Sequence, residues 1–250
     1  MTLQIRVLGS EPAWPSASRA CSGLLVRTAG STVLADCGTG VFERLRSVMA
    51  PEQLTAVVVS HLHFDHWVDL LPFRYYLKFE ARPPVPPRLH LPPGAIEKLQ
   101  SIVEQIDPGP RFFADVFETS EYDPGGELCV GDLRVTFRKT RHPIETFALK
   151  LEAENATAVY SADTGWTESL VDFARGADLF VCEATWGEAG GDPEMHLSGA
   201  EAGRLARLAG AKRLLLTHLA EPEAEGALRA ARREYDGPLE YAAARRTFRL

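Results

Sequence analysis

Two hydrophobic patterns recur along this chain, one with the spacing of β-strands and one with the spacing of α-helices. Apolar and polar residues alternate over residues 3–8 and the alternation stops at Gly9, which is typical of a strand followed by a loop. Residues 56–60 read Ala-Val-Val-Val-Ser, a run that predicts a short strand buried on both faces. By these criteria we expect strands at residues 3–8, 23–28, 32–35, 56–60, 89–91, 112–117, 127–130, 133–139, 147–151, 157–161, 178–182 and 213–217.

Apolar residues three and four positions apart predict helices between these strands. We expect helices at residues 41–49, 67–79, 95–106, 167–174, 198–209 and 223–234, with two short strands after the last one. From residue 167 onward helices and strands alternate, and the sequence shows no internal repeat of roughly 20 to 50 residues. This order predicts one α/β domain that spans residues 1–250.

Composition narrows the class of protein. The chain has 250 residues, of which 45% are hydrophobic and 24% are charged, so it can bury a large core. Its formal net charge of −7 argues against a surface built to grip long nucleic acids. No apolar run approaches membrane-spanning length, so we expect no membrane partner. The four cysteines form no Cys-x-x-Cys pair, so we expect neither disulfides nor a zinc knuckle, and a reducing cytoplasm is the default location.

A cluster of histidines and an aspartate directly follows the buried run 56–60. It comprises His61, His63, Asp65 and His66. Imidazole and carboxylate groups are ligands that Zn²⁺ and similar ions prefer, and the end of a strand holds them rigidly. The alternative is a surface cluster satisfied by hydrogen bonds alone. Because the chain has only seven histidines and the cluster follows a buried strand, we interpret it as a metal site.

Other candidate ligands also lie near the ends of predicted strands. His142, Asp163, Glu183 and His218 each follow a strand, and His196 directly precedes a helix. Side chains at the same ends of neighbouring strands converge in space. Five histidines and two aspartates would supply a two-metal site with room for a bridging water, which indicates hydrolysis with the type of bond left open.

Three further positions have more than one interpretation. The glycine-rich turn 36–40 could cradle a phosphate on its backbone N–H groups. Asp36 in this turn could hold the loop together or hydrogen-bond a metal-ligating histidine. We expect Trp14 to serve packing rather than substrate contact, and His90 to be structural.

The ordered motifs His-x-His-x-Asp-His, His142, Ser-Ala-Asp-Thr-Gly and His218 resemble the metallo-β-lactamase superfamily. The resemblance implies an α/β (α+β) fold, a four-layer αβ/βα sandwich with a dinuclear site at one edge. It implies that Asp163 bridges the two ions opposite a nucleophilic hydroxide. The ions would be zinc, with manganese or iron as alternatives. The resemblance assigns the remaining ligands to the first ion (His61, His63, His142) and to the second (Asp65, His66, His218).

Two segments resemble the ribonuclease Z branch of that superfamily. Residues 182–185, Cys-Glu-Ala-Thr, resemble its His-Glu-Ala-Thr box with cysteine in place of the first histidine, and residues 196–198, His-Leu-Ser, resemble its His-Ser-Thr segment. By this resemblance Glu183 orients His196, and His196 contacts the scissile phosphate or the leaving oxygen. A carboxylate that fixes the tautomer of an imidazole and raises its basicity suits this role. The alternative for His196 is a helix-terminal residue without function.

One departure from ribonuclease Z changes the expected substrate. Its long basic arm for tRNA, which in the short bacterial forms lies between the third histidine motif and the bridging aspartate, is missing, because His142 and Asp163 are only 21 positions apart. The sequence therefore favours a phosphodiesterase for small or cyclic phosphodiesters, with Asp65 as a possible proton acceptor. The alternative is an RNA 3′-endonuclease that binds RNA through Arg138, Lys139 and Arg141. A lactone or thioester hydrolase and a non-catalytic metal-binding module are less favoured. The apolar segment 67–79 indicates a homodimer or a buried core helix.

Overall fold

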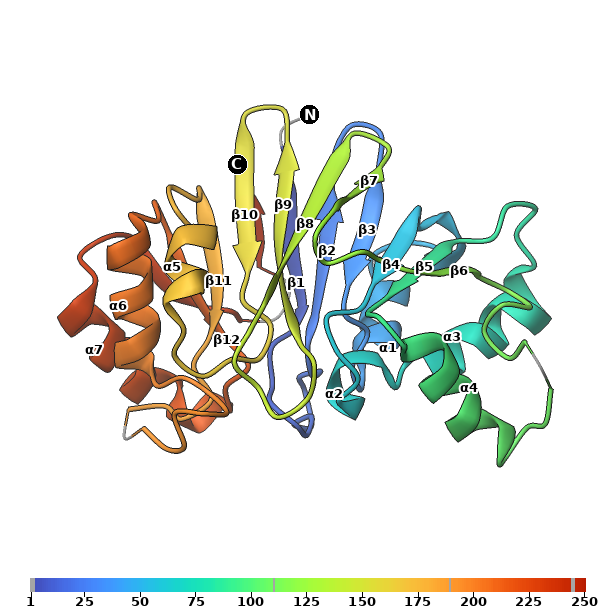
Figure 1. Cartoon of the computed structure of the whole chain (residues 1–250), viewed down its shortest axis with the longest axis horizontal. Helices are drawn as coiled ribbons and strands as arrows, with labels where there is room; N and C mark the ends of the chain where they lie inside the picture. Colours follow the sequence, from blue (N-terminus) through green and yellow to red (C-terminus); the bar gives the residue numbers. More distant parts are fainter. Residues whose placement is uncertain (1–2, 110, 189, 244–245) are drawn as a thin grey trace.

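A computed structural model describes residues 3–109, 111–188, 190–243 and 246–250 of the chain. Two seven-stranded sheets face each other in the middle of the molecule, and helices cover the outer face of each sheet (Figure 1). This arrangement of helix, sheet, sheet and helix confirms the predicted α/β sandwich.

The first sheet combines antiparallel and parallel strands. Strands β14, β1, β2 and β3 pair antiparallel, and β3, β4, β5 and β6 pair parallel. In spatial order the strands are β14 (Thr247–Arg249), β1 (Gln4–Gly9), β2 (Gly23–Arg27), β3 (Thr32–Ala35), β4 (Ala56–Val58), β5 (Arg88–Leu91) and β6 (Glu118–Glu121).

The second sheet has the same number of strands. Here β10 to β13 pair parallel, whereas β7 to β10 pair antiparallel. In spatial order the strands are β13 (Leu239–Tyr241), β12 (Leu214–Thr217), β11 (Leu179–Glu183), β10 (Ala156–Tyr160), β9 (Phe147–Ala153), β8 (Leu133–Lys139) and β7 (Glu127–Val130). The hairpin β9–β10 fills the interval between His142 and Asp163.

The helices divide between the two outer faces (Figure 1). Those next to the first sheet are α1 (Val41–Arg46), α2 (Phe64–Trp67), α3 (Leu70–Tyr76), the π-helix η2 (Leu77–Ala81) and α4 (Ala95–Glu104). Those next to the second sheet are α5 (Glu168–Phe173), α6 (Gly199–Ala209) and α7 (Ala224–Glu234). Two short 3₁₀ helices are η1 (Pro51–Gln53) and η3 (Glu221–Glu223). Within the described residues, no helix has the length and apolar character needed to cross a membrane.

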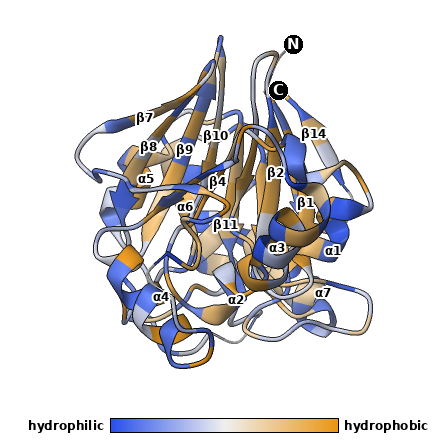
Figure 2. Ribbon diagram, turned by 90° about the vertical axis from the view of Figure 1, so that its right-hand side faces the viewer, coloured by the Kyte–Doolittle hydropathy of each residue, from blue (hydrophilic) through white to orange (hydrophobic). Residues whose placement is uncertain are grey.

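Three buried apolar layers hold these elements together. One lies between the two sheets and includes Val7 and Leu149 from opposite sides. A second joins the first sheet to α1, α3 and α4, and a third joins the second sheet to α5, α6 and α7. Figure 2 shows the hydrophobic colour concentrated along the strands. These layers fix both sheets, and so fix the ends of the strands from which the loops at the edge of the sandwich begin.

The structure corrects three sequence predictions. Residues 112–117 form turns rather than a strand, and β6 begins only at Glu118. The predicted helix 67–79 is divided, because α2 begins earlier, at Phe64, and α3 passes into the π-helix η2. Trp14 does not pack in the core, since its exposed fraction is 63%.

Candidate metal centre

The predicted ligands meet where loops from both sheets converge, beside α2 at the lower edge of the sandwich in Figure 1. Four of them follow β4, at the first sheet, and three follow strands of the second sheet. The backbone is strained here: Asp36, Ala162 and His218 have positive φ values of 61°, 49° and 53°. Such conformations persist where the surrounding structure holds them, and they cluster at functional sites.

The first group of potential ligands is His61, His63, His142 and Asp163. The Nδ1 atom of His63 lies 3.2 Å from His61 Nε2 and 3.0 Å from His142 Nε2. The Oδ2 atom of Asp163 lies 3.6 Å from His61 Nε2 and 3.8 Å from His142 Nε2. All four ligand atoms therefore surround one point.

The second group is Asp65, His66, Asp163 and His218. Asp65 Oδ2 lies 3.0 Å from His218 Nε2 and 3.4 Å from His66 Nε2. Asp163 turns its other oxygen, Oδ1, toward this group, at 3.2 Å from His66 Nε2 and 3.5 Å from His218 Nε2. One carboxylate thus presents one oxygen to each group.

The distances in both groups fit divalent ions, and two unpartnered buried atoms add support for the second group. Tetrahedral coordination with metal–nitrogen distances of about 2.0–2.1 Å places ligand atoms roughly 3.3 Å apart, which matches the distances in both groups. In addition, His66 Nε2 and Asp163 Oδ1 are buried without a hydrogen-bond partner among the described residues. These two atoms lie 3.2 Å apart, but their orientation does not form a hydrogen bond. Buried polar atoms without partners are costly unless a further group satisfies them.

Hydrogen bonds at the opposite ring nitrogens orient four of these histidines. His61 Nδ1 lies 3.0 Å from the Ser60 hydroxyl, and His66 Nδ1 lies 2.7 Å from Asp36 Oδ2. His142 Nδ1 lies 2.9 Å from the Met195 carbonyl oxygen, and His218 Nδ1 lies 2.8 Å from the Thr185 hydroxyl. Donation from Nδ1 to an oxygen leaves the Nε2 lone pair directed at the centre, the arrangement typical of metal-ligating histidines.

Asp36 performs both of the tasks that the sequence left open. It accepts hydrogen bonds from the Ser60 amide at 2.7 Å and hydroxyl at 2.8 Å, and it orients His66. It also accepts the Tyr160 hydroxyl at 3.0 Å, across the two sheets. In the glycine-rich turn, the amides of Cys37 and Gly38 are not free to cradle a phosphate, because they donate to the carbonyls of His66 and Ser22.

The electrostatic environment differs between the two groups. Burial lowers the pKa of His61 well below its ordinary value and also lowers the pKa values of His63 and His142, which favours the neutral imidazoles that bind metals. Burial alone would also lower the pKa of His66, but Asp163 and Asp36 outweigh it and raise that pKa well above its ordinary value. The carboxylates around His66 therefore favour positive charge within the second group.

Glu183 and His196 form the predicted pair beside both groups. His196 Nδ1 lies 2.8 Å from Glu183 Oε1. Glu183 is fully buried and also accepts hydrogen bonds from the backbone amides of Thr164 and Leu197. The His196 ring stacks on His218 at a centroid distance of 5.4 Å and meets His142 at 5.2 Å.

His196 lies beside the second ligand group, next to His218. Glu183, His196 and His218 are also near enough to one another to form a third potential ligand group, but the Glu183 carboxylate is already engaged by backbone amides. Burial lowers the pKa of His196, and the contact with Glu183 outweighs it, so the net change is upward. His90, in contrast, lies outside the groups of potential ligands and pairs with Ser120.

Sequence reasoning missed the residues that support the ligands. Ser60, Thr185, Tyr160 and the Met195 carbonyl all hold groups at the centre. Ser60 ends the buried run and Thr185 ends the Cys-Glu-Ala-Thr box, so both lie in motifs that the sequence analysis had already identified. Tyr160 and Met195 gave no such signal, because their role depends on contacts between distant segments.

The αβ/βα sandwich with two histidine–aspartate groups at its edge defines the class of metallo-hydrolases with the metallo-β-lactamase fold. Residues 31–219 match the family model of the β-lactamase superfamily domain, and the chain belongs to that superfamily. It is 31% identical to the probable metallo-hydrolase YhfI of Bacillus subtilis, with 87% of each chain covered. The crystal structure of B. subtilis YhfI, a metallo-β-lactamase fold protein, has a TM-score of 0.89 at 27% identity, with 99% of both chains covered. The chain is also 29% identical to ribonuclease Z of Halorubrum lacusprofundi, with 95% of this chain and 94% of the relative covered.

Proposed function

We propose that this metallo-hydrolase is a phosphodiesterase that acts on small or cyclic phosphodiesters with two divalent metal ions. The observation that carries the proposal is the contact between Glu183 and His196 beside the two ligand groups. Hydrolysis of a phosphodiester develops negative charge on the phosphoryl and leaving oxygens, and an imidazolium held at this place can stabilise it or donate a proton.

The proposed ligands follow the two groups. His61, His63 and His142 would hold one ion, and Asp65, His66 and His218 the other, with Asp163 shared. When bound, the pair of ions supplies Lewis-acid polarisation of the phosphoryl group and a water acidified toward neutral pH. Zinc suits this mixture of imidazole and carboxylate, and manganese or iron remain alternatives.

The chain's own groups would position the substrate and move protons. Glu183 holds the Nδ1–H of His196, so His196 Nε2 is the atom that faces the substrate. Asp65 is proposed as both a ligand and an acceptor of the proton released by the attacking water. Burial works against its charge, but His218 and His66 outweigh burial and keep the pKa of Asp65 below its ordinary value, so the carboxylate stays ionised, as a ligand requires.

Ribonuclease Z-like cleavage of RNA is the second candidate, favoured by the similarity to ribonuclease Z. The contacts of Arg138, Lys139 and Arg141 argue against the basic face proposed to bind RNA. Lys139 pairs with Glu145 and Arg141 pairs with Glu194, so two of the three cations are already compensated. The third, Arg138, lies over the Phe173 ring.

Steady-state hydrolysis tests the proposal. The substrates are bis-p-nitrophenyl phosphate, 2′,3′-cyclic AMP, 3′,5′-cyclic AMP, a precursor tRNA, a lactone and a thioester, with metal content measured on the same sample. Preference for a small diester supports the proposal. Preference for the tRNA with steep salt dependence would establish the RNA alternative. Turnover of the lactone or thioester alone, or bound metal without any turnover, would refute the phosphodiesterase proposal.

The remaining expectations belong to the same proposal. We keep residues 1–250 as one hydrolase domain and, because all four cysteines are free, the cytoplasm as its location.

The surface available for the proposed homodimer is smaller than the segment 67–79 suggested, because Trp67 and Phe73 are buried in the chain's own core. Tyr75 and Phe79 remain exposed and stack on each other. Sedimentation velocity tests this assembly, and a monomer at micromolar concentration would remove it.

A further inference from the structure

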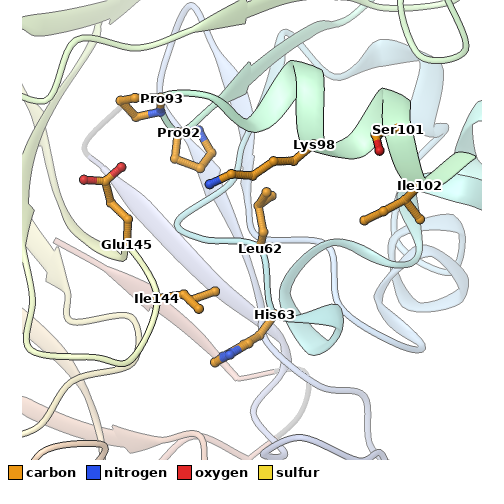
Figure 3. Close-up of a pocket in the computed structure, with 9 residues that line it drawn as sticks. All are labelled: Leu62, His63, Pro92, Pro93, Lys98, Ser101, Ile102, Ile144 and Glu145. Atoms are coloured by element: carbon orange, nitrogen blue, oxygen red, sulfur yellow. The ribbon is translucent and has the colours of Figure 1, made fainter.

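A cavity of about 450 Å³ lies directly beside the proposed metal centre. His63 forms part of its wall, and the same ring turns Nδ1 toward the first ligand group. The other walls come from the segment after β5, from α4 and from the connection between β8 and β9 (Figure 3). A phosphodiester bound at the metal centre would therefore direct one of its ester groups into this cavity.

The walls of the cavity are mainly aliphatic. Leu62, Pro92 and Ile144 lie around it, and Ile102 closes the side formed by α4. The volume falls within the range of roughly 300–1,000 Å³ that is typical of small-molecule sites. Such walls suit a flat group with apolar faces better than a glycerol, which has little apolar surface to bury. Apart from His63, the lining includes no aromatic side chain, so it does not form the aromatic cage that quaternary ammonium groups prefer.

Two charged side chains give the cavity a polar end. Lys98 extends from α4 across the cavity toward the side on which Glu145 lies (Figure 3). Among the described residues Lys98 has no hydrogen-bond or ion-pair partner, whereas Glu145 contacts Lys139. The cavity therefore offers an uncommitted cationic donor and a carboxylate acceptor. A nucleobase with an amino group beside a ring nitrogen presents the complementary acceptor and donor, and Lys and Glu are established partners of such groups.

We propose that this cavity binds the nucleoside part of the substrate and that Lys98 is a specificity-determining residue for it. The inference rests on the proposed phosphodiesterase function and narrows its substrates to nucleoside phosphodiesters with an amino-substituted base. The base lies between the aliphatic walls, Lys98 donates to its ring nitrogen, and Glu145 accepts from its amino group.

The test compares Lys98→Met with the wild-type chain on two diesters. Lys98→Met keeps the length of the side chain but removes the charge. It should lower kcat/KM for 3′,5′-cyclic AMP about tenfold, the low end for a hydrogen bond to a charged group, because Lys98 is exposed. The rate with methyl p-nitrophenyl phosphate, which has no base, should stay within about twofold of wild type. Lys212→Met removes an exposed lysine between α6 and β12 that pairs with Asp178; it is the control and should change neither rate.

Equilibrium binding of adenosine separates this inference from the proposed function. Adenosine has no phosphodiester to place at the metal centre, so its binding to the protein as purified, with its metal content measured, reports on the cavity, and Lys98→Met should raise its Kd about tenfold. Equal losses on both diesters, or no change in the binding of adenosine, would overturn the inference while leaving the phosphodiesterase proposal in place. If wild type cleaves no phosphodiester, the proposed function fails, and adenosine binding still decides whether Lys98 recognises a nucleoside.

Discussion

Replacing His196 by alanine should remove most of the chemical rate without removing the metal ions. General acid–base groups contribute roughly 10²–10⁴-fold to rates, so we expect kcat to fall by about 10²- to 10³-fold, or about 3–4 kcal/mol in activation free energy. The lower part of the range applies because His196 is proposed to act alongside two ions that stabilise the same developing charge.

The structure explains why His196→Ala should leave the rest of the centre intact. Glu183 Oε1 keeps the Thr164 amide at 2.7 Å, so truncation does not orphan the buried carboxylate. His142 and His218 lose only a ring contact, because the Met195 carbonyl and the Thr185 hydroxyl still hold their Nδ1 atoms.

The assay combines steady-state hydrolysis of bis-p-nitrophenyl phosphate with metal analysis of the same preparation. His90→Gln is the matched control, because His90 is a buried histidine that pairs with Ser120 in the first sheet. It should change kcat by less than about twofold. A His196→Ala protein that loses an ion, or that keeps its full kcat, would refute the assignment of His196 as a helper rather than a ligand.

Three further predictions test the centre and its surroundings. Asp163→Ala should reduce the bound metal measured by mass spectrometry and abolish turnover, since this carboxylate faces both ligand groups; full occupancy would contradict the shared role. Gly38→Ala should lower the free energy of unfolding by about 2 kcal/mol or more in urea denaturation, because the added Cβ would lie 1.7 Å from the Asp65 carbonyl oxygen. A maleimide should label only Cys129 in the folded chain, because the other three thiols are buried and burial raises the pKa of Cys21 to about 12; mass mapping would detect any other site.

The potential ligands could be predicted because they stand in short motifs after strands. His61 and His63 follow a run of β-branched residues, so the strand and the position of the ligands at its end can both be predicted from neighbouring residues. The strands predicted at residues 147–151 and 157–161 likewise rest on local patterns, and they are β9 and β10 of the structure. Elements of this kind are readable because the side chains that define them are close in sequence.

Features that depend on distant contacts could not be predicted. Phe112 looked like the start of a strand, but the Arg74 guanidinium donates to its carbonyl oxygen and lies over its ring, and the same guanidinium pairs with Asp115. These contacts stabilise turns in place of a strand. The link from Tyr160 to Asp36 spans 124 positions, and no local pattern reveals it.

The potential ligands of the proposed metal centre come from both halves of the sandwich. His61, His63, Asp65 and His66 belong to the half that carries the first sheet, and His142, Asp163 and His218 belong to the other. Neither half has a complete group of potential ligands, so ions bound here would link the two halves. Because a ligand that binds only the folded state stabilises it by mass action, the free-ion concentration should set how tightly the sandwich stays closed. Metal supply would then govern the lifetime of this protein as well as its turnover.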